Sequence, residues 1–581
     1  MKLPKDILVR MRHSCEHVLT QVMLKLYPSL LMAMGPAIED GFYFDFDYKG
    51  KISETDFPKI EQEMQKIIDQ NLPIKKEVLS VKKARLLFKN NSYKQEWLDE
   101  IQNKGQKATV YWTGKDFVDL CSGPHLTSTG KIGPFKLLSV AGAYWHGDEK
   151  NKMLTRIYGT CFPTKEELNR YLWQQAEAKK RDHRLLGKKL DLFVINEAIG
   201  KGLPLLTPKG NIIREEILKY EHQLENLAGF MRVSCPHIAR TEIYKKTGHW
   251  QHYRELMYAP FGIDGKDYVL KPMNCPHHYM IYANRPRSYR DLPMRLAEDG
   301  TCYRFEKTGE LSGLLRVRAL TIDDAHVLMT EEQLEGEFAL CISMIDKMFK
   351  AFHLQDYYVR LSLADPSDAV KYISDPKTWK KAGEKLEKIV KKNKLKYVIA
   401  KNEASFYGPK IDYLVKDSLG REWQMSTLQL DLFMAKRLNL TYADKDGKEK
   451  HPVIIHRGLT GSLERTIGIL IEHFAGAFPL WLSPIQAIII PITDNHLPYG
   501  KKVFEQIKKA DIRVELDDRS QTTSAKIRDA ELQKTPYMIV VGDREIKENS
   551  IALRKRGQKK IENLKLNSFI KRVKSEIDKK I

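Results

Sequence analysis

The sequence lacks the features that mark several large classes of protein. No apolar run approaches the roughly 20 residues of a membrane-spanning helix. The basic N-terminus has no apolar stretch of the kind that a secretory signal requires. Seven cysteines, thinly spread over 581 residues, do not suit a disulfide framework. We therefore expect a protein of the reducing cytoplasm that does not associate with membranes.

Two common nucleotide-binding signatures are also missing. No G-x-x-x-x-G-K-[ST] loop occurs, and no G-x-G-x-x-G follows a predicted strand, which disfavours P-loop and Rossmann sites. What is present is a surplus of positive charge, with a formal net charge of +22. Such a surplus attracts phosphate polyanions by counterion release. A generally lysine-rich composition would give the same value, so charge alone suggests nucleic acid as a partner without establishing it.

The chain is too long for a single hydrophobic core, and its patterns divide it into four parts. Residues 1–163 mix helical and strand patterns and end in a strand-like segment at 153–162. Residues 164–190 predict one long, charged linker helix opened by a Thr-x-x-Glu capping box. Residues 191–483 form a large middle domain, in which the charge run at 380–394 has apolar residues at helical spacing and predicts an amphipathic helix. Residues 484–581 alternate strands with helices, which predicts a small α/β domain with a mainly parallel sheet.

The middle domain contains an ordered trio of charged residues that suits ATP. Arg304 and Glu306 are two apart, and on a strand they would point to the same face, where they could hold a phosphate and an adenine amino group. Much later, Arg465 follows a glycine-bearing turn and opens a predicted helix, where its planar guanidinium could stack on a base or bind a terminal phosphate. A lone R-x-E carries no information, but the ordered trio is specific.

The segments RFEKTGELSGLLRVRALTIDDAH, FYGPKIDY, WQMSTLQLD and HRGLTGSLERTIGILIEHFAGAFPLWL resemble the core of threonyl-tRNA synthetases, which belong to class II. The likeness extends from GPAIEDGFYFDF to PYMIVVGDRE. It implies a multidomain α+β protein: an N-terminal α+β editing domain, a class II catalytic core with an antiparallel sheet, and a C-terminal α/β anticodon-binding domain. It also implies the activity, which is ATP-dependent ligation of L-threonine to tRNA(Thr) through threonyl-adenylate, with hydrolysis of mischarged seryl-tRNA(Thr).

The resemblance also assigns roles in the catalytic domain. It implies that PKGNIIREEI (208–217) is motif 1, a helix at a homodimer interface, and that the ordered trio binds ATP with Mg2+. It implies one zinc ion held by Cys275, His326 and His456. A thiolate and two imidazoles suit zinc and leave coordination positions open, here for the amino and hydroxyl groups of threonine. The further matched positions, catalytic and substrate-binding, are Arg316, Lys410, Asp324, Tyr407, Gln424, Gln429, Ser462 and Met273.

Hydroxyl recognition separates two competing amino acids. A site that engages a substrate hydroxyl rejects an analogue without it, here valine, by roughly 10^4–10^5. Serine keeps the hydroxyl and lacks only a methyl, so its rejection rests on about 1–3 kcal/mol. A second, hydrolytic site is the expected remedy for serine.

The N-terminal domain contains a candidate for that second site. His13 and His17 share one helical face, and Cys121 and His125 form a C-x-x-x-H pair. These four residues have the number and type of ligands that a zinc site requires, whereas the resemblance implies an editing pocket that needs no metal. The family's accompanying residues match Lys94, Asp119 and Tyr43. Metal binding here remains an alternative.

In the C-terminal domain, charged residues are candidates for tRNA contacts. Glu545 could accept a hydrogen bond from a cytosine amino group, and each cation could equally be an ordinary solvated surface charge. The candidates are Arg519, Lys526, Arg528, Arg544, Glu545 and Arg554.

Three departures from the family pattern stand out. The chain begins just ahead of His13, where most members carry a further small domain, so we expect that domain to be missing. Ile322 replaces the usual glutamine before Asp-Asp-Ala-His, which puts one polar substrate contact in doubt. RSQTTS (519–524) replaces Arg-Asn-Glu-Lys-Ile-Gly, and we expect altered anticodon contacts.

Two other hypotheses are a class II ligase of different specificity and an idle, synthetase-derived RNA-binding regulator; the intact ligands and arginines disfavour both.

Overall fold

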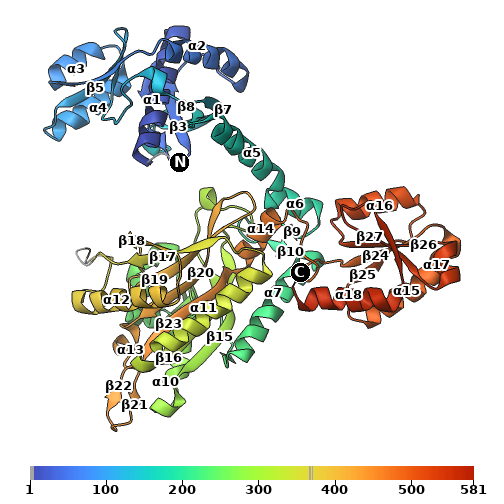
Figure 1. Ribbon diagram of the computed structural model, residues 1–581. Coiled ribbons are helices and arrows are strands. Elements are labelled where there is room, and N and C mark those ends of the chain that lie inside the picture. The colour runs from blue at the N-terminus through green and yellow to red at the C-terminus, as the bar shows by residue number, and fades with distance from the viewer. Residues whose placement is uncertain (1–4, 366–367, 369–370, 581) are drawn as a thin grey trace. The chain divides into compact units, whose positions relative to one another are not determined.

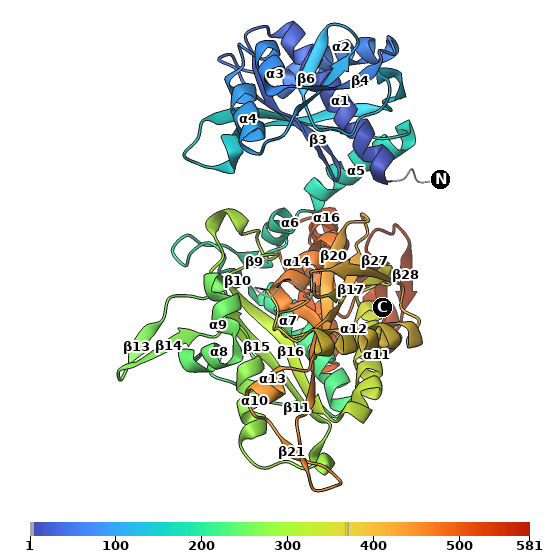
Figure 2. The same ribbon diagram turned by 90° about the vertical axis from the view of Figure 1, so that its left-hand side faces the viewer.

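The computed structural model describes residues 5–365, 368 and 371–580 (Figures 1 and 2). It divides into two compact units, the first ending at Ala176 and the second beginning at Glu177. Among the described residues, no helix is both long and apolar enough to cross a membrane.

The first unit is built on helix α1 (Lys5–Leu26) and an antiparallel sheet that runs β1-β3-β8-β7, with β2 paired to β3. Cys15, Val18, Leu19 and Val22 recur at helical spacing on α1 and are buried against the phenylalanines of β3 in one cluster. The strands of this sheet are β1 (Leu31–Met34), β2 (Ala37–Ile38), β3 (Gly41–Asp47), β7 (Phe135–Tyr144) and β8 (Met153–Cys161).

A second, three-stranded sheet completes this unit. It consists of β4 (Ile74–Leu79), β5 (Ala108–Thr113) and β6 (Phe117–Leu120). The helices are α2 (Phe57–Asp69), α3 (Val81–Leu87) and α4 (Ser92–Asn103). The predicted strand at 153–162 is confirmed by β8.

The predicted single helix over residues 164–190 is wrong. The chain forms α5 (Lys165–Arg181) and α6 (His183–Lys189), broken at Asp182. The Asp182 carboxylate accepts a hydrogen bond from the Arg184 amide at 2.8 Å and so caps α6. His183 explains the break, because its amide and its ring Nδ1 lie 3.0 and 2.7 Å from Glu472, which anchors α6 to the catalytic core. A tertiary contact thus overrides the helical pattern.

The second unit contains an eight-stranded sheet in the order β11-β15-β16-β23-β20-β19-β17-β18. The pairings from β15 through β17 are antiparallel, and the edge strands β11 and β18 pair in parallel. The strands are β11 (Met231–Arg232), β15 (Met294–Tyr303), β16 (Ala319–Met329), β17 (Tyr357–Leu363), β18 (Tyr397–Lys401), β19 (Lys410–Lys416), β20 (Glu422–Asp431) and β23 (Val453–Ser462).

Three long helices share a hydrophobic core with this sheet: α7 (Pro208–Leu227), α11 (Leu334–Ala351) and α14 (Leu463–His473). Helix α11 packs on β20 and β23 (Figure 1). Thr207 caps α7, with proline at its first position, as the sequence at motif 1 favours. Helix α12 (Pro376–Lys392) confirms the amphipathic helix expected over 380–394.

Smaller elements surround the sheet. They are β9 (Phe193–Val194), β10 (Leu205–Leu206), β12 (Ile238–Arg240), α8 (Thr241–Thr247), α9 (His249–His252), β13 (Phe261–Ile263), β14 (Lys266–Leu270), α10 (Cys275–Ala283), α13 (Met434–Arg437), β21 (Tyr442–Ala443) and β22 (Glu449–Lys450). Figure 2 shows β13 and β14 as a projecting hairpin.

The C-terminal part of the second unit has a five-stranded sheet in the order β25-β24-β26-β27-β28. The predicted mainly parallel sheet is only half right, because β24 pairs in parallel with β25 and β26, whereas β27 and β28 pair antiparallel. The short helix α17 between β26 and β27 lets the chain return in the opposite direction. The elements are β24 (Ala487–Pro491), α15 (Leu497–Lys509), β25 (Val514–Leu516), α16 (Thr523–Leu532), β26 (Tyr537–Val541), α17 (Asp543–Glu548), β27 (Ile551–Lys555), β28 (Ile561–Leu564) and α18 (Leu566–Asp578).

Candidate functional sites

A cavity of about 640 Å3 lies over the eight-stranded sheet. With one exception, the predicted catalytic, substrate and metal residues line it: Met273, Cys275, Arg304, Glu306, Arg316, Asp324, His326, Tyr407, Gln424, Gln429, His456, Ser462 and Arg465. The exception is Lys410, whose ammonium lies 2.9 Å from the buried Asp412 carboxylate. Gln424 donates a hydrogen bond to the same carboxylate at 2.8 Å, so Lys410 reaches the cavity lining through a shared partner.

Strand register positions the predicted metal ligands. His326 on β16 lies directly opposite His456 on β23, and Gln429 on β20 is the next residue across. Cys275, the first residue of α10, completes the group. One donor atom from each of these three residues lies within 4.8 Å of the others, and all three side chains are buried.

The donor set fits a divalent metal. His326 Nε2 and His456 Nδ1 face each other at 3.1 Å. Burial holds the pKa of His326 well below its usual range, so the imidazole is neutral and offers a lone pair. Burial also raises the pKa of the Cys275 thiol, so only a nearby cation would make it a thiolate. A thiolate with two imidazoles is a donor set for soft or borderline ions.

Three buried residues that the sequence analysis missed contact the outer ring nitrogens of these histidines. His278 Nδ1 lies 2.8 Å from His326 Nδ1. Asp431 Oδ2 and the Tyr279 hydroxyl lie 3.2 and 3.1 Å from His456 Nε2. Cys275 and His278 are three apart on one helix and therefore share a face, a spacing that would have indicated His278. Asp431 has no such local signal, because its strand reaches β23 only through the fold.

The predicted strand position of Arg304 and Glu306 is wrong, although both residues line the cavity. Strand β15 ends at Tyr303, and the Glu306 amide donates to the Arg304 carbonyl at 2.9 Å in a tight turn. This turn, and not strand alternation, brings the two side chains to one cavity. The Glu306 carboxylate also pairs with Arg316 at 2.7 Å.

Arg465 is presented by the first turn of α14. Ser462 caps this helix and accepts a hydrogen bond from the Arg465 amide at 3.4 Å. The Arg465 Nε is buried, and within the described part of the chain it has no hydrogen-bond partner. Burial lowers the pKa of this guanidinium. A buried cationic donor without a partner beside a cavity favours an anionic ligand.

Asp324 lies beside the predicted metal ligands. Its Oδ1 is 3.9 Å from His326 Nε2, and its Oδ2 accepts a hydrogen bond from Asn274 at 3.2 Å. Ile322, Asp324 and His326 alternate along β16, and all three line the cavity. Opposite them, Tyr407 donates its hydroxyl hydrogen to Gln429 at 2.6 Å. At this point the wall therefore combines polar groups with the apolar side chain of Ile322.

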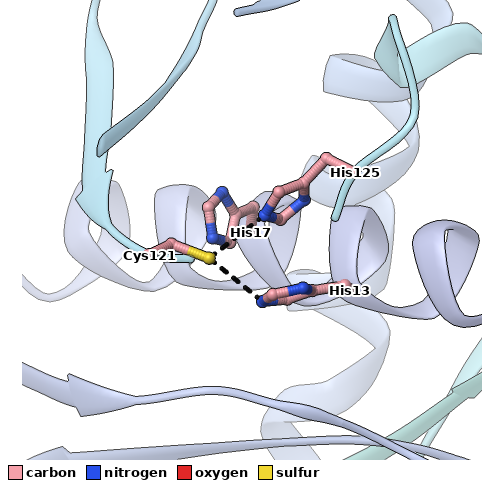
Figure 3. A group of neighbouring side chains, drawn as sticks. All are labelled: His13, His17, Cys121 and His125. Atoms are coloured by element: carbon pink, nitrogen blue, oxygen red, sulfur yellow. Dashed lines mark hydrogen bonds between the residues drawn. The ribbon is translucent and has the colours of Figure 1, made fainter. Parts of the chain in front are cut away.

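A second cavity, of about 470 Å3, lies in the first unit and is lined by His13, His17, Lys94, Asp119 and Cys121, among others. The structure brings together the two predicted pairs (Figure 3). Cys121 Sγ lies 3.3 Å from His13 Nε2 and 3.2 Å from His125 Nε2. Burial raises the pKa of Cys121 to about 12, so the thiol is protonated at neutral pH.

Lys94 and Asp119 form a buried ion pair at 2.6 Å within this second cavity. Asp119 also lies 4.0 Å from His17 Nε2, which links the pair to the histidine cluster. Tyr43 is not among the described residues that line the cavity. Its ring lies under the Arg156 guanidinium, 3.7 Å from the ring centre.

The predicted anticodon residues fall into three pairs. Arg519 and Arg528 are exposed, and both pair with Asp529, at 3.0 and 3.2 Å. Lys526 and Glu545 are buried; Lys526 donates to the Asp517 carbonyl at 3.0 Å, and Glu545 accepts from the Gly542 amide at 3.0 Å at the start of α17. The remaining two pair with carboxylates, Arg544 with Glu548 and Arg554 with Glu531.

Known proteins share these features. Residues 261–474 match the family described as tRNA synthetase class II core domain (G, H, P, S and T), residues 486–576 the anticodon binding domain, and residues 108–158 the threonyl and alanyl tRNA synthetase second additional domain. The antiparallel sheet, its cavity and these matches define a class II aminoacyl-tRNA synthetase.

Relatives narrow the class. A threonine–tRNA ligase of Rubrobacter xylanophilus is 46% identical over 98% of this chain and 88% of its own length, and one of Thermus thermophilus is 45% identical over 96% and 87%. A solved RNA-binding domain of threonyl-tRNA synthetase from Cryptosporidium parvum aligns with a TM-score of 0.65 at 33% identity, covering 68% of this chain and 98% of that one. The chain belongs to the threonine–tRNA ligases, enzymes that join threonine to tRNA with ATP.

Proposed function

We propose that this ligase selects threonine through a zinc ion held by Cys275, His326 and His456, and that its N-terminal cavity hydrolyses seryl-tRNA(Thr). The observation that carries the proposal is the buried triad in the wall of the cavity that also presents Arg304, Glu306 and Arg465. An ATP site and a metal site in one cavity suit an enzyme that activates an amino acid with ATP and selects that amino acid by its side chain.

Protein side chains complete the threonine site. When bound, zinc would offer open coordination positions to the amino and hydroxyl groups of threonine. The Asp324 carboxylate is positioned beside these ligands to accept the hydroxyl proton, and Asn274 holds its other oxygen. Valine cannot supply an oxygen, so a site built on this contact rejects it by roughly 10^4–10^5. The further substrate contacts that we propose are Met273, Tyr407, Gln424, Gln429 and Ser462.

ATP, with Mg2+, binds to the other part of the cavity. Arg304 contacts the α-phosphate, Glu306 accepts from the adenine amino group, and Arg465 supplies its buried Nε, which has no partner among the described residues, to the distal end of ATP. Arg316 orients Glu306 through their ion pair. Lys410 helps to position Gln424, because both contact the Asp412 carboxylate. The amino acid carboxylate then attacks the α-phosphorus and expels pyrophosphate to form threonyl-adenylate, and the tRNA hydroxyl attacks the threonyl carbonyl carbon and expels AMP.

The second cavity removes serine. His13, His17, Cys121 and His125 position a water molecule against the seryl ester, with Lys94 and Asp119 as a fixed ion pair in the wall. We assign this step without a metal, and place Tyr43 at its edge. The exposed cations Arg519 and Arg528, with Arg554, contact the anticodon arm, whereas the buried Lys526 and Glu545 hold the loops that present them.

The proposed homodimer forms through motif 1. The outer face of α7 carries a hollow lined by Glu215, Leu218, Lys219, His222, Gln223, Asn226 and Leu227. Leu227 is 78% exposed there, an apolar side chain that a second copy would cover. We place the enzyme in the cytoplasm and propose the domain limits 1–163, 164–190, 191–483 and 484–581.

Two assays test the proposal. ATP–pyrophosphate exchange should be supported by threonine, weakly by serine and hardly by valine, and metal analysis should find one zinc per chain. Hydrolysis of preformed seryl-tRNA(Thr) should be fast in the wild type and lost in His13→Ala/His17→Ala, which still charges threonine. Equal exchange with threonine and valine would contradict the proposed selection of threonine by zinc. Unchanged hydrolysis in the double variant would contradict the proposed editing site.

A further inference from the structure

A chain of buried side chains runs outward from the metal ligand His326. The Nδ1 of His326 lies 2.8 Å from Nδ1 of His278, and the Nε2 of His278 lies 3.3 Å from Oε2 of Glu298. The other oxygen of Glu298 accepts a hydrogen bond from the Cys235 amide at 2.6 Å. All three side chains are buried, so water does not compete for these contacts.

Only one hydrogen can lie between two facing Nδ1 atoms, and this restricts the protonation of both rings. If His326 gives its Nε2 lone pair to a metal, its Nδ1 must carry the hydrogen and donate it to His278. The Nδ1 of His278 is then an acceptor, so its Nε2 carries the hydrogen and donates it to Glu298. A carboxylate at the far end accepts and cannot donate, and it therefore favours this order over the reverse.

We propose that His278 and Glu298 are positioning residues that fix the tautomer of His326 and so determine how tightly the metal is held. The inference rests on the proposed metal site. The other histidine ligand, His456, contacts a carboxylate directly: its Nε2 lies 3.2 Å from Asp431, and the Tyr279 hydroxyl lies within hydrogen-bond distance of both, 3.1 Å from the ring and 3.3 Å from the carboxylate. His326 reaches its carboxylate through a second imidazole.

The same residues do not suit a second cation site. Cys235, His278 and Glu298 offer donor atoms within 4.8 Å of one another. However, the buried Lys271 ammonium lies 3.7 Å from Glu298 Oε2 and already supplies the positive charge. Hydrogen bonds from His278 and the Cys235 amide outweigh the effect of burial and lower the pKa of Glu298 to about 2. The group is therefore an anchored acceptor.

The test compares two replacements of His278 in the full chain. His278→Leu removes the acceptor, whereas His278→Asn retains an oxygen near the position of Nδ1. Zinc affinity, measured by competition with a chromophoric chelator, should fall about 10–100-fold in His278→Leu, and His278→Asn should recover most of the loss. The matched control is His277→Leu, because both ring nitrogens of His277 lack a partner within the described residues; it should bind zinc like the wild type.

The absorption bands of the Co2+-loaded protein give a second readout, which should shift in His278→Leu and not in His277→Leu. If His278→Leu does not fold, Glu298→Gln takes its place. The glutamine side chain has one accepting oxygen where the carboxylate has two, so it cannot accept from both His278 and the backbone N–H of Cys235. The zinc affinity of Glu298→Gln should therefore also fall. Wild-type affinity in His278→Leu or Glu298→Gln, or equal losses in the Leu and Asn variants, would overturn the relay while leaving the metal site intact. A wild type that binds no zinc would overturn the metal site itself, and the relay with it.

Discussion

Replacing Cys275 by serine should remove most of the preference for threonine over valine. In the proposed site the Cys275 thiolate is one of three zinc ligands, and two imidazoles alone would hold zinc poorly. A serine hydroxyl fills the same space, so the cavity wall keeps its shape. The change therefore affects the metal more than the packing.

The size of the effect follows from the recognition of one hydroxyl. A preference of roughly 10^4–10^5 corresponds to about 5.5–7 kcal/mol at 1.36 kcal/mol per tenfold. Without the metal, the proposed site loses the ligand that recognises the hydroxyl, and a pocket that discriminates by shape alone manages only about 10^2. The threonine-to-valine ratio of kcat/KM should thus fall by about 10^2–10^3, chiefly through slower use of threonine.

The assay is ATP–pyrophosphate exchange at several concentrations of each amino acid, together with zinc content. The matched control is Cys341→Ser, since Cys341 is equally buried on α11 but does not line the cavity. Cys341→Ser should keep both the metal and the ratio. A Cys275→Ser enzyme that retains the wild-type ratio and zinc content would refute the reasoning.

Three other outcomes are expected. Lys94→Met should leave Asp119 buried without its ion-pair partner, which should cost about 3–5 kcal/mol in local stability and let seryl-tRNA(Thr) accumulate. Hydrogen exchange would measure the loss of stability and a deacylation assay the loss of editing; an unchanged deacylation rate would contradict the editing role. Burial raises the pKa of Glu472, but hydrogen bonds from His183 outweigh this effect and the pKa is lowered. The contact therefore stabilises the fold above the ordinary carboxyl pKa, and this stabilisation is lost as the pH falls through the lowered value. The midpoint of acid unfolding, followed by fluorescence, should differ between Glu472→Gln and the wild type; coincident unfolding curves of the two proteins would contradict the argument. Leu227→Asp should weaken the proposed dimer at least about 10^2-fold, because each copy loses about 1.5–3 kcal/mol of apolar burial; sedimentation would detect monomers, and an unchanged dimer would move the interface elsewhere.

Local patterns predicted several elements correctly. The period-3.6 pattern at 380–394 corresponds to α12, and the strand pattern at 153–162 to β8. Both signals lie within one segment, where a buried face imposes its spacing. The strand–helix alternation after residue 484 was likewise correct, but the sheet direction was not, because pairing direction depends on long-range connections.

The errors arose where contacts between residues far apart in the sequence determine the local structure. Asp182 breaks a continuous helical pattern because His183 contacts Glu472, 289 residues away in the sequence. Arg304 and Glu306 reach one cavity through a turn that no strand pattern indicates. The site was predicted through resemblance more than through spacing: Cys275, His326 and His456 are far apart in sequence, and no periodicity joins them. The surrounding His278 and Asp431 were therefore missed.

If His326 and His456 hold the proposed zinc ion, their pairing across β16 and β23 makes amino acid choice depend on strand register. A slip of one residue would turn either side chain to the opposite face and abolish the site. The backbone hydrogen bonds of two long strands prevent that slip before any ligand arrives, so little ordering free energy is spent when the metal binds. Accuracy at threonine codons would then be carried as much by the alignment of two β-strands as by the residues that touch the substrate, and substitutions that loosen this alignment should cause mistranslation from outside the cavity.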